Sequence, residues 1–122
     1  MYLNNTFDSH DFIISISNGI PVLKFNMLRA TLKETQAFKL HLASLTSANH
    51  RFIILDFTDC AFIDSAIAGV MVTMAKELRN KNGDLLAIVP SGTINKMFIQ
   101  TGFDRIIKKF SDLSSALASI NI

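Results

Sequence analysis

The sequence predicts an α/β domain in which a mixed, mostly parallel β-sheet packs against helices. Three observations lead to this fold class: an Asn-Gly pair between two early apolar stretches, a later alternation of short apolar runs with segments of helical period, and a composition that is 49% hydrophobic and 18% charged. The expected order of elements is β-β-α-β-α-β-α-β-α. Strands that alternate with helices after an initial hairpin favour a mixed sheet with mainly parallel pairing.

The first elements are predicted to be a hairpin and a helix. Residues 12–17 and 20–25 are the expected hairpin strands, because Asn18-Gly19 between them is typical of a two-residue turn. Pro21 has no backbone donor, which places it at a sheet edge, a strand start or a bulge. The apolar positions of residues 30–47 then recur at helical spacing.

The rest of the chain is predicted to alternate between strands and helices. Residues 52–55 form an uninterrupted apolar run, as in a strand covered on both faces. A connection over residues 59–65 precedes an amphipathic helix that ends at Asn82-Gly83. The remaining expected elements are a buried strand at 85–89, a helix that opens at 90–93 and stops at Gly102, a short strand at 105–108, and a terminal helix capped by Ser111 or Asp112.

Length and charge limit the possible functions. With 122 residues the chain is expected to form one domain over residues 1–122, which can bury a core without a disulfide or a metal. Its 12 basic and 10 acidic residues give a net charge of +2, which predicts no strong attraction to nucleic acid or to a membrane. We find no signal-peptide pattern and no apolar run of bilayer length. A single cysteine fits a reducing, cytoplasmic setting.

The residues that carry catalysis or bind metals in other proteins give no convincing pattern here. The three histidines are scattered without metal-ligand spacing, and no glycine-rich phosphate loop is present. Cys60 is interpreted as a small, half-buried residue rather than a nucleophile. Asp56 and Asp59 are expected to cap loop amides rather than to accept a phosphoryl group as in a receiver domain. The sequence therefore predicts no enzyme, no cofactor and no metal.

The pair Asp64-Ser65 stands directly before the second helical segment and has two interpretations. Both residue types are preferred N-caps, worth about 1 kcal/mol each where they bond a free helix amide. A serine in the first helical turn is also exposed, and a phosphate there would meet free N–H groups and the positive end of the helix dipole. A partner docked over the modified serine would have to bury a hydrated dianion, so the hydroxyl could act as a switch.

Several blocks in this order resemble the STAS domain of bacterial anti-sigma factor antagonists. The strand 52–57, the loop Ala61-Phe62-Ile63-Asp64-Ser65 and the helix that begins Ala66-Ile67-Ala68-Gly69-Val70 carry the resemblance, together with segments 82–89 and 98–107. The match covers residues 52–117 well and the first fifty residues by pattern only. Two features depart from the family: Ile67 replaces the first glycine after the serine, and the Gly-x-x-Asp of the region near 28–31 is absent.

The resemblance implies a regulatory binding protein that is not itself an enzyme. In its unphosphorylated form such a protein sequesters an anti-sigma factor that is also a serine kinase of the GHKL type, and a PP2C-type phosphatase restores that form. Carried over by position, Ser65 is the expected phosphorylation site. The expected partner-binding residues are Asp64, Ser65, Ala66, Ile67 and Gly69.

Two other functions stay open at this point. The same fold could serve as a constitutive interaction subunit of a transporter ATPase or of a sensory complex, with Ser65 acting only as a helix cap. A small-ligand binder or an enzyme of another class is the third possibility, although no convergent catalytic set supports it.

Overall fold

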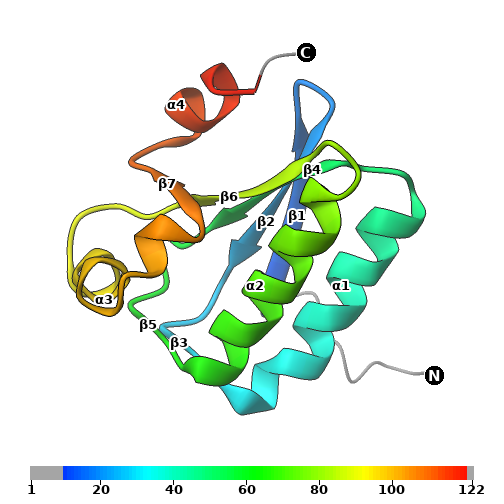
Figure 1. Ribbon diagram of the computed structural model, residues 1–122. Helices are drawn as coiled ribbons and strands as arrows, with labels where there is room; N and C mark the ends of the chain where they lie inside the picture. Colours follow the sequence, from blue (N-terminus) through cyan, green and yellow to red (C-terminus); the bar gives the residue numbers. More distant parts are fainter. Residues whose placement is uncertain (1–9, 121–122) are drawn as a thin grey trace.

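A five-stranded sheet is at the centre of the computed structural model, which describes residues 10–120 (Figure 1). Its strand order is β1-β2-β4-β6-β7. The strands of this sheet are β1 (Phe12–Ser17), β2 (Ile20–Phe25), β4 (Phe52–Asp56), β6 (Asp84–Ile88) and β7 (Lys108–Phe110). The pair β1–β2 is antiparallel and the other pairs are parallel. The predicted fold class, a mixed and mostly parallel sheet packed against helices, is confirmed.

Helices cover both faces of this sheet. The helices α1 (Thr35–Ser47), α2 (Ser65–Arg79) and α3 (Thr93–Thr101) supply buried residues to one face, and α4 (Leu113–Ala118) covers the other. Two short 3-10 helices, η2 (Leu32–Glu34) and η3 (Phe103–Arg105), precede α1 and β7. Within residues 10–120, none of the helices combines the length and the apolar character that a membrane crossing requires.

The hairpin between β1 and β2 forms as predicted. Asn18 and Gly19 both have positive φ, 53° and 77°, as a type I′ turn requires. Pro21 is the second residue of β2, which lies between β1 and β4. The pairing of β2 with β4 begins only at Val22, so the missing donor of Pro21 falls before that ladder.

Three predicted boundaries were wrong. Residues 30–34 do not belong to the α-helix: Arg29–Ala30 is the short strand β3, and Leu32–Glu34 is the 3-10 helix η2. The backbone N–H of Thr31 donates to Oε1 of Glu34 (2.8 Å) in a capping box, and α1 begins only at Thr35. The connection 59–65 contains the strand β5 (Phe62–Ile63), which pairs with β3 in parallel. The last strand runs over 108–110 rather than 105–108, because Gly102 leads into η3 instead of directly into a strand.

The main core lies between the sheet and the three helices, and phenylalanine dominates it. Phe12, Phe25 and Phe38 contact one another with ring centroids 5.0–5.9 Å apart, and Phe57 extends the cluster from Phe25 toward α3. Met71 and Met74 are buried on α2. A smaller core beneath α4 is built on Ile54 and Leu86. Burial of these side chains is the main stabilising contribution to the fold.

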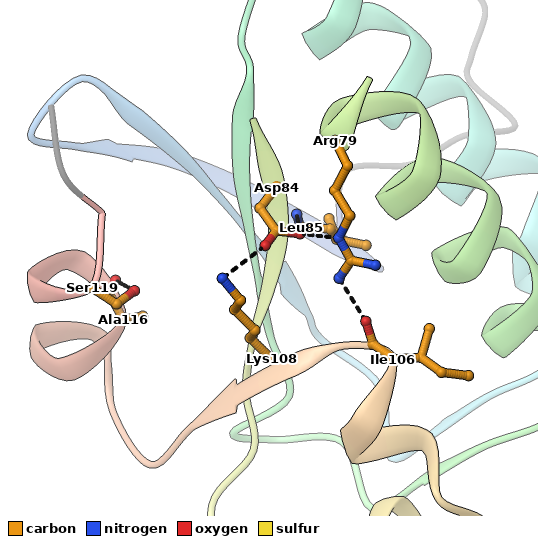
Figure 2. A network of polar contacts seen from close by, with 7 residues as sticks. All are labelled: Arg79, Asp84, Leu85, Ile106, Lys108, Ala116 and Ser119. Carbon is orange, nitrogen blue, oxygen red and sulfur yellow. Dashed lines mark hydrogen bonds and ion pairs between the residues drawn. The ribbon is translucent and has the colours of Figure 1, made fainter. Parts of the chain in front are cut away.

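A polar network fixes the end of α2 to the sheet (Figure 2). The buried carboxylate of Asp84 accepts from Nε of Arg79 (2.8 Å) and from its neighbour's amide, Leu85 N (2.8 Å), and Nζ of Lys108 lies 3.3 Å away. Arg79 also donates to the backbone carbonyl of Ile106 (2.6 Å). The network therefore joins α2, β6 and β7, and it compensates for burying a charge.

Gly83 lets the backbone of Arg51 approach closely, and we expect any side chain at this position to destabilise the fold. A Cβ at this position would lie 1.8 Å from the carbonyl oxygen of Arg51, which accepts the bond from Asp84 N. We expect Gly83→Ala to lower the free energy of unfolding by about 2–3 kcal/mol, because the backbone must shift. Gly69→Ala is the matched control: a Cβ there meets nothing within 4 Å, so α2 should gain up to about 1 kcal/mol. Urea unfolding measures both, and equal effects would contradict the prediction.

His41 predicts a loss of stability at low pH. Its Nε2 is buried and has no hydrogen-bond partner among residues 10–120, its ring lies 5.4 Å from that of Phe12, and burial lowers its pKa. Since the folded protein binds this proton less well than the unfolded chain, the contribution of His41 is full above the unfolded pKa of about 6.5 and is lost as the pH falls through the folded value. Urea unfolding at pH 7.5 and pH 5.5 should show this difference. The variant His41→Phe should show a smaller one, and an unchanged difference would exclude His41 as its source.

Candidate functional site

The site begins with the carboxylate of Asp64, which connects two elements distant in the sequence. Asp64 has extended backbone geometry (φ −97°, ψ −178°) and is the N-cap of α2. Its Oδ1 accepts from Ile67 N (3.1 Å) and its Oδ2 from Leu32 N (2.9 Å), at the start of η2. The pairing of β5 with β3 brings these segments together. One side chain thus caps α2 and holds the entrance to α1 beside it.

Ser65 is the first residue of α2, and its side chain is exposed. Between residues 10 and 120 no group forms a hydrogen bond with its hydroxyl. The predicted capping role therefore belongs to Asp64, and Ser65 is left available to solvent. The first amides of an α-helix have no intrahelical acceptor, and Asp64 occupies only that of Ile67. An anion on Ser65 would lie at the positive end of α2.

Ser65 forms part of the wall of two grooves. The first, of about 710 Å³, lies between α1 and α2 and also involves Ala66, Gly69 and Val70. The second, of about 470 Å³, lies between the start of α2 and the α3–η3 region, where Ala68, Met97 and Phe103 line it. Both grooves are mainly apolar. A protein that docks over the start of α2 would therefore cover the serine and bury the apolar surface of these grooves at the same time.

Exposed apolar side chains surround this end of the molecule. Leu28 and Leu32 are 68% and 71% exposed, and Ile106, which lines the second groove, is 43% exposed. The guanidinium of Arg29 lies over the ring of Phe62, 4.1 Å from its centroid. Large exposed apolar residues grouped around clefts are typical of protein-binding surfaces.

The predicted partner-binding residues do not all reach the surface. Gly69 is exposed and Ala66 half-buried, and both line the groove between α1 and α2. The side chain of Ile67 is fully buried in the main core, so it cannot touch a partner directly. Its contribution to the site is indirect, because its amide is the one that Asp64 caps.

The other candidate residues have structural partners. Asp56 accepts from Thr58 N (2.9 Å), which agrees with the predicted loop cap, whereas Asp59 instead pairs with Nζ of Lys24 (2.9 Å). Cys60 is fully rather than half buried, and burial raises the pKa of its thiol, which keeps it protonated. Over the described part of the chain, no group of three or more His, Cys, Asp or Glu side chains could hold a metal ion.

Sequence reasoning missed the contribution of residues 28–34. Because it assigned residues from 30 onward to a helix, it did not place Leu32 beside Ser65 in the groove between α1 and α2. The pattern Thr31-x-x-Glu34 is a capping-box signature and could have marked the later helix start. The contact of Asp64 with Leu32 N depends on pairing between distant segments, and no local pattern encodes it.

Comparisons with known proteins place this geometry in a family. The family model described as the STAS domain matches residues 6–116, and the chain belongs to this family. TM1081 from Thermotoga maritima has a similar structure, with a TM-score of 0.80 and 21% identity over 93% of this chain and 98% of that one. An anti-sigma factor antagonist from Mycobacterium paratuberculosis aligns with a TM-score of 0.79 and 13% identity, covering 89% of this chain and 92% of its own.

A further similar structure comes from Bacillus. The cell fate determinant SpoIIAA in its phosphorylated form aligns with a TM-score of 0.67 and 17% identity, over 90% of this chain and 99% of that one. At these identities the likeness establishes a common fold. Together with the family match, it confirms the predicted resemblance to STAS domains.

The double role of Asp64 generates a prediction about stability. We expect Asp64→Ala to lower the free energy of unfolding by about 2–3 kcal/mol, since it removes the N-cap of α2 and the acceptor for Leu32 N together. Ser65→Ala, which removes a hydroxyl without a partner, should stay within about 0.5 kcal/mol of the wild type. Urea unfolding of both variants gives the comparison. A larger loss in Ser65→Ala than in Asp64→Ala would contradict this assignment of the cap.

Proposed function

We propose that this protein is a regulatory binding protein of the anti-sigma factor antagonist type, controlled by phosphorylation of Ser65. The observation that carries the proposal is the exposed hydroxyl of Ser65 at the start of α2, which no group in the described part of the chain bonds and which lies between two apolar grooves. Such a hydroxyl is accessible to a kinase, and a docked protein would cover it.

The physical basis of the switch is the cost of burying charge. Phosphorylation adds nearly two negative charges next to the Asp64 carboxylate, which is already committed to two amides. The helix dipole and the free amides of the first turn stabilise the phosphate while it is hydrated. An apolar partner surface placed over it would have to strip that hydration, at a cost of several kcal/mol, which is enough to abolish micromolar binding.

The proposed partner of the unphosphorylated form is an anti-sigma factor that is also a serine kinase of the GHKL type, with a PP2C-type phosphatase that reverses the modification. The chain itself serves as substrate and ligand rather than as an enzyme. The similar Mycobacterium and Bacillus structures support the class of function, and the placement of Ser65 supports the site. The proposal assigns the protein to transcription regulation in the bacterial cytoplasm.

The decisive experiment compares three forms of Ser65. A candidate kinase from the same genome, incubated with the protein and ATP, should add one phosphate, which intact-mass analysis and peptide mapping place on Ser65. Ser65→Ala should stay unmodified and bind that kinase as tightly as the wild type. Ser65→Asp should bind at least about tenfold more weakly, because it leaves a charge in the covered surface.

Two results would reject the switch. One is a phosphate on another residue. The other is undiminished affinity of Ser65→Asp, which would leave a constitutive binding subunit as the better description.

A further inference from the structure

The groove between α1 and α2 extends far beyond Ser65. Figure 1 shows the two helices side by side with their amino ends at the same end of the molecule. Leu32 and Ser65 line the groove at this end, and Thr46 and Glu77 line it at the other. Leu42, Val70 and Met74 form its apolar floor, and small residues such as Ala43 and Ala66 flank it. It is an elongated apolar channel rather than a closed pocket.

Two charged side chains of opposite sign line this channel, Glu77 near its far end and Lys39 between the two ends. Lys39 stands one turn into α1, and Glu77 stands more than three turns into α2. They are therefore separated along the groove by about two helical turns, or roughly 12 Å. Across residues 10–120 neither of them takes part in an ion pair. Both charges are free to pair with a molecule in the groove.

The shape of the groove, which two neighbouring helices border, suits an α-helix. The walls are themselves helices, and a third helix packs into the furrow between two neighbours with an interaxial distance of about 8–10 Å. Gly69 lies in one wall, where even an added Cβ would meet nothing within 4 Å, so a backbone can approach closely at this point. Helices that dock in apolar grooves present anchors at spacings of three, four and seven residues.

We propose that the α1–α2 groove binds an amphipathic helix of a partner protein, with an acidic side chain opposite Lys39 and a basic side chain about two turns away opposite Glu77. This inference rests on the proposed function, because it specifies the part of the partner that meets Ser65. The acidic residue of the bound helix lies between Ser65 and the far end of the groove, about one helical turn along α1. A phosphate on Ser65 therefore adds negative charge beside the partner's own negative charge, and the helix is expelled.

Synthetic peptides test the charge pairing directly. One helical peptide of about 18 residues carries a leucine face, an acidic residue and a basic residue two turns from it; a second carries basic residues at both positions. Fluorescence anisotropy with the full, unphosphorylated chain should show that the wild type prefers the mixed-charge peptide by about tenfold. Lys39→Glu should reverse this preference. The design holds for either direction of the peptide in the groove.

Two further variants complete the experiment. Gly69→Gln should abolish binding of both peptides without loss of stability, because it fills the groove with a side chain that the isolated protein accommodates. Lys76→Glu is the matched charge control: Lys76 is exposed on α2 but does not line the groove, so the preference should remain that of the wild type. Urea unfolding confirms that each variant is folded.

Several outcomes would overturn the inference. These are failure of both peptides to bind, an unchanged preference in Lys39→Glu, or an equal reversal in Lys76→Glu. Sedimentation showing a dimer that depends on Lys39 and Glu77 would assign the groove to a second copy of the chain instead. None of these results affects the Ser65 kinase assay, so failure of the groove and failure of the phosphorylation switch can be distinguished.

Discussion

The arrangement of this protein's surface depends on the two hydrogen bonds that the Asp64 carboxylate accepts. One oxygen caps α2, and the other accepts from the first amide of η2. The start of α2 is therefore held at a fixed position relative to η2, which leads into α1. The strand pair β3–β5 provides the scaffold for this contact. Ser65 is exposed because its neighbour has already taken the capping role. Asp64 therefore stabilises the start of α2, while Ser65 next to it provides the accessible hydroxyl.

The far end of α2 is held just as firmly by different chemistry. There Arg79 bonds both the buried Asp84 and the carbonyl of Ile106, which also lies beside the groove next to α3. The amino end of α2 is held to η2, its carboxyl end is attached to the sheet, and its inner face is buried among Met71, Ala75 and Leu78, so α2 is a rigid support. A charge added at its amino end acts on a surface that cannot rearrange easily to avoid it.

The sequence predicts most of the fold because its signals are local. The Asn18-Gly19 turn, the apolar run at 52–55 and the stop at Gly102 each depend on the chemistry of a few neighbouring residues, and each is found as expected. Residues 30–34 were misassigned for two reasons: Ala30 belongs to a strand set by pairing with β5, about thirty residues away in the chain, and the local capping box of Thr31 and Glu34 was not recognised. Of the predicted site, Asp64 and Ser65 lie where a helix start requires. The burial of Ile67 follows from its place on the apolar stripe of α2 with Met71 and Leu78, a local pattern at helical spacing that conflicts with a direct contact to a partner.

Ser65 belongs to the walls of two separate grooves, and this position determines whether both grooves can be occupied at once. Two ligands that both cover Ser65 would clash, so binding of one excludes the other, although the remaining residues of the two grooves do not overlap. A single covalent modification of this shared residue would then weaken binding at either groove. The protein could take part in a competition between ligands without any change in its own shape.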